Sequence, residues 1–139
     1  MRFKEAVKSC AYTKYSDFKT RSSRSEFWWF MLGLALVNIV LIGVSQVLPG
    51  IGSSMIAGFG LVILCPYAAA LVRRLHDVGL SGKWVAAAFA VSVVASTAAT
   101  YPEFAPAAWG TPAVFLLLFI TALFPGKKAA NAYGPAPES

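Results

Sequence analysis

Residues 27–48 read FWWFMLGLALVNIVLIGVSQVL, a run of 22 residues without a charged side chain. At about 1.5 Å of rise per residue, such a run forms a helix long enough to cross roughly 30 Å of hydrocarbon. Three more uncharged runs follow at residues 51–72, 84–100 and 108–124. The sequence therefore predicts an all-α fold, an integral membrane four-helix bundle.

Polar segments flank these runs and divide the chain into three regions. Residues 1–26 form a basic arm, residues 27–125 a four-span transmembrane domain, and residues 126–139 a Pro-rich tail that we expect to be extended. The chain is 58% hydrophobic and 13% charged. Because a soluble domain carries about 25% charged residues, much of this surface is expected to face lipid. Pro66 lies inside the second run and predicts a kink there.

The basic arm carries an apolar repeat of its own. Five of its residues recur at spacings of three and four: Phe3, Ala6, Val7, Cys10 and Ala11. This pattern predicts an amphipathic helix on the membrane surface, with a disordered arm as the alternative. We interpret Cys10 and Cys65 as free thiols, because their spacing fits neither a metal site nor a disulfide framework.

The basic residues lie in only three segments. All 12 Lys and Arg residues fall in the arm, in residues 73–83 or in the tail, and the other two loops contain none. With four spans these segments lie on one side of the membrane, which the positive-inside rule makes cytoplasmic. Both termini are therefore expected in the cytoplasm. The net charge of +6 indicates attraction to anionic lipid and not to nucleic acid.

Small residues at four-residue spacing are typical of helix contacts in lipid. The predicted packing positions are Ser54 and Gly58 in the second run and Ala88, Ser92, Ser96 and Thr100 in the third. Trp28, Trp29 and Trp84 stand at the basic ends of their runs. An indole is partly hydrated at that level, so we interpret these three residues as interface anchors.

Three polar motifs adjoin the runs on the basic side. They read RSSRSEFWWF at 21–30, RRLHDVGLSG at 73–82 and NAYGPAP at 131–137. In this order, over the whole chain, they resemble a family of small bacterial inner-membrane proteins classified as domain of unknown function 805. The resemblance implies a four-span bundle in the bacterial cytoplasmic (inner) membrane and supplies no reaction.

The charged residues of the first two motifs form the candidate site. Arginine binds phosphate with two parallel hydrogen bonds, and an acidic residue nearby pairs with one arginine and leaves the others for an anionic group. We expect one network on the cytoplasmic side, made of Arg21, Arg24, Glu26, Arg73, Arg74, His76 and Asp77. The alternative is that the same network only fixes topology and joins two helical hairpins.

Three functions remain open at this stage. The preferred one is an interaction or assembly module that binds anionic lipid or a membrane-protein partner, including a second copy of the chain. A small oligomeric channel or transporter is disfavoured because no span contains a charge. A membrane enzyme that acts on a lipid headgroup through His76 and Asp77 is disfavoured because no nucleophile motif accompanies them. His76 is the only histidine, and we predict no catalytic residue, metal site or cofactor.

Overall fold

The structure, a computed structural model, describes residues 2–137. In chain order its helical elements are α1 (Phe3–Lys8), η1 (Ser9–Thr13), α2 (Arg24–Val47), α3 (Pro49–Val78), α4 (Lys83–Ala98), η2 (Pro102–Trp109) and α5 (Gly110–Leu123). Of these, η1 is a π-helical turn and η2 is a 3₁₀ helix. The described residues contain no β-strand, so the prediction of an all-α fold is confirmed.

Within residues 2–137, three segments are long and apolar enough to cross a membrane: α2, α3, and the stretch Pro102–Leu123 that joins η2 to α5. The fourth apolar helix, α4, has 16 residues and extends about 24 Å. The four predicted runs thus correspond to four apolar helices. The boundaries differ most at the end of α3, which continues to Val78, whereas we expected Arg73 and Arg74 to end this helix and a loop to follow. It also continues through Pro66, so any bend there leaves the helix unbroken.

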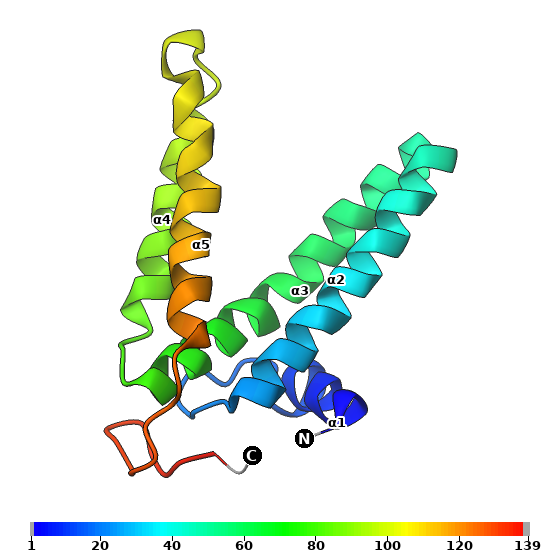
Figure 1. The fold of residues 1–139 in the computed structure, drawn as a ribbon. Helices are drawn as coiled ribbons and strands as arrows, with labels where there is room; N and C mark the ends of the chain where they lie inside the picture. Colours follow the sequence, from blue (N-terminus) through cyan, green and yellow to red (C-terminus); the bar gives the residue numbers. More distant parts are fainter. Residues whose placement is uncertain (1, 138–139) are drawn as a thin grey trace.

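The four apolar helices form two antiparallel hairpins. α2 packs along α3, α4 packs along α5, and Figure 1 shows the two pairs diverging from a common base like the arms of a V. At this base, Trp28 of α2 packs on Phe119 of α5, and the rings of Tyr67 and Phe115 join α3 to α5 with their centroids 6.1 Å apart. Contact between the hairpins is therefore concentrated at one end. In a closely packed four-helix bundle it would extend along the length of the helices.

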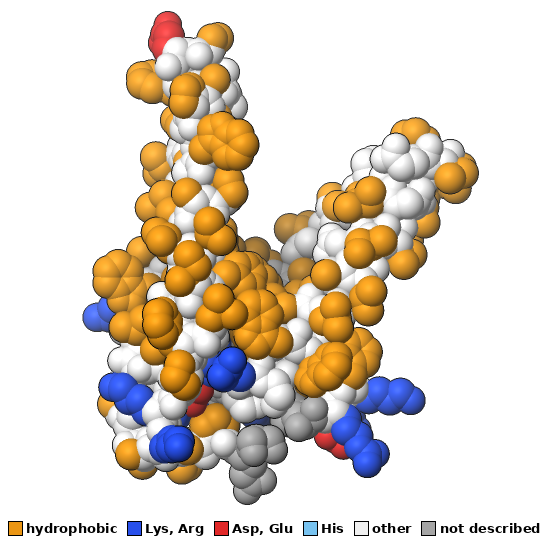
Figure 2. Space-filling view, viewed as in Figure 1, with side chains coloured by type: hydrophobic (Ala, Val, Ile, Leu, Met, Phe, Trp, Pro, Cys, Tyr) orange, Lys and Arg blue, Asp and Glu red, His pale blue; other side chains and the backbone are white. Residues whose placement is uncertain are grey.

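The basic arm folds against this base. Phe3 meets Trp29 edge to face, with ring centroids 5.9 Å apart, and Ala6 and Cys10 are fully buried. The arm thus contains a short helix, and its apolar side packs on α2, whereas the apolar repeat predicted a helix on the membrane surface. Figure 2 shows the Lys and Arg side chains gathered at this end of the molecule, while hydrophobic side chains cover both arms of the V.

The contact face of α4 differs from the predicted stripe of small residues. Val85, Ala88 and Ala95 are its buried residues, and Ser92 is half-buried. Ser96 and Thr100 are exposed, as are Ser54 and Gly58 of α3. A step of four residues turns a helix by about 400°, so a strict four-residue stripe drifts about 40° per step away from any contact face. The buried residues of α4 are three and seven positions apart, and this spacing keeps them on one side of the helix.

The tight turn between α2 and α3 depends on Gly52. Leu48 is the non-helical residue of the turn, and Pro49 begins α3, where its missing N–H costs no hydrogen bond. A Cβ atom at Gly52 would lie 2.3 Å from the Cα atom of Ser45. Only a residue without a side chain lets the two backbones approach this closely.

We therefore expect Gly52→Ala to destabilise the first hairpin by about 1–3 kcal/mol, the usual cost of overpacking. The measurement is the free energy of unfolding in mixed micelles under increasing denaturing detergent. Gly58→Ala in the same helix is the matched control, because its Cβ atom would meet nothing within 4 Å. Equal effects of the two substitutions would contradict this role of Gly52.

Candidate functional site

The last turns of α3 send four buried polar side chains to different neighbours: Arg73, Arg74, His76 and Asp77. Successive side chains on a helix point about 100° apart, so this short stretch reaches several surrounding elements. The helix ends at Gly79, whose φ of 93° suits glycine and whose N–H donates to the carbonyls of Leu75 and His76. Four of the seven predicted site residues thus lie on one helical end.

The Asp77 carboxylate is shared by two arginines. Arg21 donates from Nη2 and Nε to Oδ1 at 2.8 and 3.1 Å, and Arg74 donates from Nη1 to Oδ2. All three side chains are at most 5% exposed. We call these three residues the Asp77 cluster. Removing the shared partner of such a buried group leaves an uncompensated charge and costs about 3–5 kcal/mol.

Arg74 also joins the two hairpins. Its Nε donates to the Ala122 carbonyl at 3.0 Å, and its Nη2 donates to the Phe124 carbonyl. The last carbonyls of a helix have no partner within the helix, and cations are favourable there. One side chain of α3 therefore caps the end of α5.

Arg73 holds the basic arm. Its Nη1 donates to the carbonyls of Lys14 and Asp17 at 2.7 and 3.1 Å, and its Nη2 contacts the Cys10 sulfur at 3.2 Å. Arg73 is fully buried. Its two terminal nitrogens are thus directed at the arm, and its buried Nε has no hydrogen-bond partner in the described part of the chain.

Glu26 is the centre of a second cluster. It accepts hydrogen bonds from Ser9 Oγ at 2.7 Å and Ser22 Oγ at 3.1 Å, and Lys14 Nζ lies 3.4 Å away. We expected Asp77 or Glu26 to pair with an arginine; Asp77 pairs with two, and within residues 2–137 Glu26 pairs with Lys14. The Cys10 sulfur lies 3.8 Å from the Glu26 carboxylate and 3.2 Å from Arg73. We expected a single network, but the charged residues form two clusters, one around Asp77 and one around Glu26. Cys10 contacts both Glu26 and Arg73.

His76 and Asp77 do not pair. The His76 ring stacks on Tyr133 at 3.7 Å with an interplanar angle of 3°, and its Nδ1 lies 3.2 Å from the Thr20 carbonyl. In the described chain no hydrogen bond joins the His76 and Asp77 side chains, whose neighbours are different. The geometry of a His–Asp acid–base pair is thus not formed here. No group of three potential metal ligands occurs among residues 2–137.

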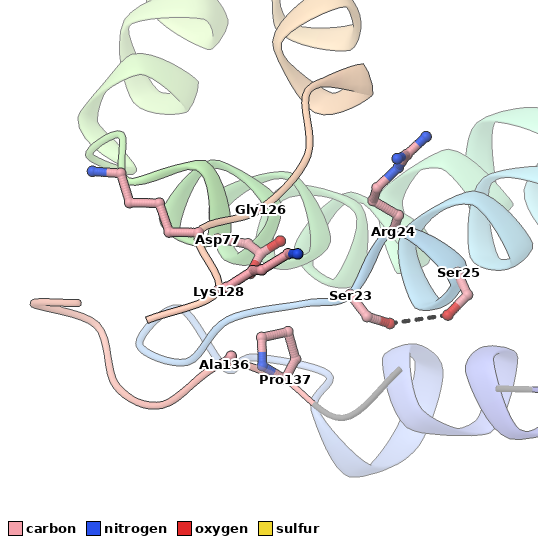
Figure 3. A pocket seen from close by; sticks show the side chains of 9 residues that line it. Ser23, Arg24, Ser25, Asp77, Gly126, Lys128, Ala136 and Pro137 are labelled. Carbon is pink, nitrogen blue, oxygen red and sulfur yellow. Dashed lines mark hydrogen bonds between the residues drawn. The ribbon is translucent and has the colours of Figure 1, made fainter. Parts of the chain in front are cut away.

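Arg24 differs from the other predicted arginines. It is exposed, and no hydrogen bond or ion pair joins its guanidinium to another residue in the described part of the chain. With Ser23, Ser25, Asp77, Gly126 and Lys128 it lines an open cavity of about 440 Å³ (Figure 3). A second depression, of about 310 Å³, shares Arg24 and Ser25 and continues onto hydrophobic side chains of α2.

The three predicted anchor residues all lie near the basic end. Trp29 and Trp84 are exposed by 39% and 61%, and Trp28 is half-buried against Phe119. Trp28 and Trp29 line the second depression together with Leu32. These two indoles thus stand between the charged clusters and the apolar part of α2, and their role as interface anchors stays a prediction.

Sequence reasoning missed several members of these clusters. Ser9, Cys10 and Lys14 reach Glu26 from the arm, and Asn131 and Tyr133 reach His76 from the tail. The tail motif at 131–137 was a signal for the last two, because it combines polar and aromatic residues in a segment otherwise expected to be extended. No local pattern marks the contacts of the arm.

The architecture and the site define a class: an all-helical protein with membrane-span-length apolar helices and a buried charged cluster at one end. The chain belongs to the family described as protein of unknown function (DUF805), which matches residues 15–135. This confirms the resemblance found in the three polar motifs. No curated protein and no solved structure matches the chain.

Asp77→Asn tests the Asp77 cluster. The substitution keeps the shape but leaves Arg21 and Arg74 without a counter-ion, so we expect a loss of about 3–5 kcal/mol in the free energy of unfolding. Detergent unfolding and protein abundance in the membrane are the measurements. Glu103→Gln removes an exposed carboxylate at the opposite tip and should change neither. A stable, abundant Asp77→Asn protein would contradict the structural importance of the carboxylate.

Cys10 offers a test by chemical labelling. Burial raises the pKa of its thiol to about 11, although the charge of Arg73 acts in the opposite direction. The reactive thiolate is thus scarce in the folded protein, and folding opposes ionisation between about pH 9 and pH 11, so thiolate formation lowers stability as pH rises through that range. We expect little maleimide labelling of Cys10 at pH 7.5 and fast labelling after denaturation, read by mass spectrometry. Equal rates in both states would contradict the burial of Cys10.

Proposed function

We propose that this chain is an integral protein of the bacterial inner membrane, that its basic end faces the cytoplasm, and that this end binds the phosphate of an anionic phospholipid through Arg24. The observation that carries the proposal is the difference in how the arginines are used. Arg21, Arg73 and Arg74 are buried and bonded to groups of the protein, whereas Arg24 is exposed beside a cavity.

The position of Arg24 in the fold favours a lipid over an acidic protein as the ligand. Arg24 begins α2, so it stands where the apolar helix meets the charged base. The smaller depression that Arg24 lines continues past Trp28 and Trp29 to Leu32. A phospholipid has the same order of groups, with a phosphate next to an apolar chain. Lys128 adds a second cation at the first cavity, and basic residues at the cytoplasmic surface are attracted to anionic lipid by about 1 kcal/mol each.

The local chemistry also suits a phosphate. A guanidinium donates two parallel hydrogen bonds to phosphate oxygens, and the start of a helix carries partial positive charge that favours an anion. The hydroxyls of Ser23 and Ser25 lie 3.1 Å apart and point away from the Arg24 guanidinium (Figure 3). The guanidinium and the helix start therefore carry the recognition of a phosphate headgroup, which involves no chemical step, so the proposed role is binding and not catalysis.

Lipid binding to the purified full-length chain tests this proposal. In mild detergent, native mass spectrometry should show tighter binding of short-chain phosphatidylglycerol than of phosphatidylcholine, and binding should weaken with salt. Arg24→Gln should weaken phosphatidylglycerol binding about fivefold, since an exposed ionic contact contributes up to roughly 1 kcal/mol. Phosphatidylcholine binding should not change.

Lys4→Gln is the matched control, because it removes one exposed cation of the same end that does not line the cavity of Arg24. Equal weakening by both substitutions would mean that only total charge matters. Absence of any preference for the anionic lipid would refute the proposal.

A further inference from the structure

The tail after α5 lies across the basic end and separates two polar cavities. The first is the cavity of Arg24, and the second, of about 370 Å³, is lined by Lys14, Arg21 and Glu26. Ala136 and Pro137 form part of the wall of both. Removing this segment of the tail would join the two cavities into one basin.

The basin is basic. Outside the tail its lining contains three cations and two carboxylates, namely Lys14, Arg21 and Arg24 against Glu26 and Asp77, and the tail itself carries Lys127 and Lys128. At its floor, Arg21 is 4% exposed. A buried cation at the bottom of a basic depression is what recognition of an oxyanion requires.

Backbone oxygens of the tail occupy the donors of Arg21 that do not face Asp77. Nη1 donates to the carbonyls of Ala129 and Gly134 at 3.0 and 3.2 Å, and Nη2 donates to the carbonyl of Lys127. Three oxygens converge on one guanidinium, and a phosphate group presents its oxygens in a similar way. Neutral carbonyls are weaker partners for a guanidinium than charged oxygens are.

Besides the hydrogen bonds from Arg21, few contacts hold the tail in place. Lys127 N–H donates to the Asp77 carbonyl at 2.9 Å, Asn131 Nδ2 donates to the His76 carbonyl at 2.9 Å, and Tyr133 stacks on His76. None of residues 126–137 is buried. The hydrogen bonds of the tail are partly buried, but the tail buries little apolar surface, and the charge-assisted bonds of a phosphate would replace the carbonyls that Arg21 loses.

We infer that the tail is a displaceable plug over an oxyanion site centred on Arg21, and that the phosphate of an anionic ligand replaces the tail carbonyls. This inference rests on the proposed function, since Arg24 and Lys128 at the outer cavity would meet the phosphate first. The buried arginine then provides the inner part of the same site. Ligand binding and tail position are coupled, so each weakens the other by the same factor.

Hydrogen exchange of the tail together with lipid binding tests the plug. In the wild-type chain, short-chain phosphatidylglycerol should raise amide exchange of residues 127–134, and phosphatidylcholine should not. Inorganic phosphate is the third ligand in the comparison. If phosphate acts as strongly as the lipid at equal concentration, the ligand is a soluble phosphate; if only the lipid acts, the ligand is a headgroup. Both results support the site, and no effect from either overturns it.

Tyr133→Ala removes the stacking contact with His76 and leaves every cation of the basin in place. It should raise tail exchange without ligand and strengthen phosphatidylglycerol binding about fivefold, and Asn131→Ala, which removes the other side-chain contact, should act in the same direction. Tyr12→Ala is the control, because Tyr12 is 81% exposed at the same end. A freed tail with unchanged lipid affinity would overturn the plug.

The two proposals fail in different ways. If lipid binding depends on Arg24 but leaves tail exchange unchanged, the plug is wrong and the proposed function stands. If neither the wild-type chain nor Tyr133→Ala prefers the anionic lipid, both fail. Unchanged unfolding free energies of the variants show that a changed affinity is not a loss of fold.

Discussion

The buried carboxylate of Asp77, shared between Arg21 and Arg74, is the interaction on which the rest of this structure depends. Burying charges costs several kcal/mol each, and the cost is offset only when every group has its partners. Here the remaining donors of the two arginines are used as well, on the carbonyls at the end of α5 and in the tail. The ion pair thus requires α3, α5 and the segment before α2 to be assembled together, and the outer donors of Arg21 need either the tail carbonyls or an anion in their place.

This dependence explains where the two hairpins meet. Apolar area gives no driving force for helix association once the helices are surrounded by lipid, and the two hairpins diverge over most of their length (Figure 1). They converge where polar groups must be satisfied and where aromatic rings of α2, α3 and α5 pack. Charged and aromatic contacts at one end therefore determine the shape of the molecule, because they fix how the two apolar hairpins are oriented.

The two interpretations of the charged residues both describe part of the molecule. Six of the seven predicted residues are buried and bonded within the protein, which fits a network that joins hairpins. The seventh, Arg24, points outward next to a cavity, which fits a site for an anion. The same physical rule accounts for both, since a buried charge needs a fixed partner whereas an exposed one stays available to a ligand.

By itself the sequence determined the four apolar helices, the helix in the arm and the separation of all the basic residues from the two far loops. Uncharged runs and amphipathic spacing are local patterns, so no knowledge of distant contacts was needed to find them. Only the tertiary structure decided that α3 extends to Val78, that Glu26 pairs with Lys14, and which arginine remains exposed. Those outcomes depend on partners between 12 and 113 residues away, many of them backbone carbonyls that every residue possesses. The sequence therefore does not indicate which carbonyls accept hydrogen bonds from an arginine. The partners of each arginine are known only from the folded structure.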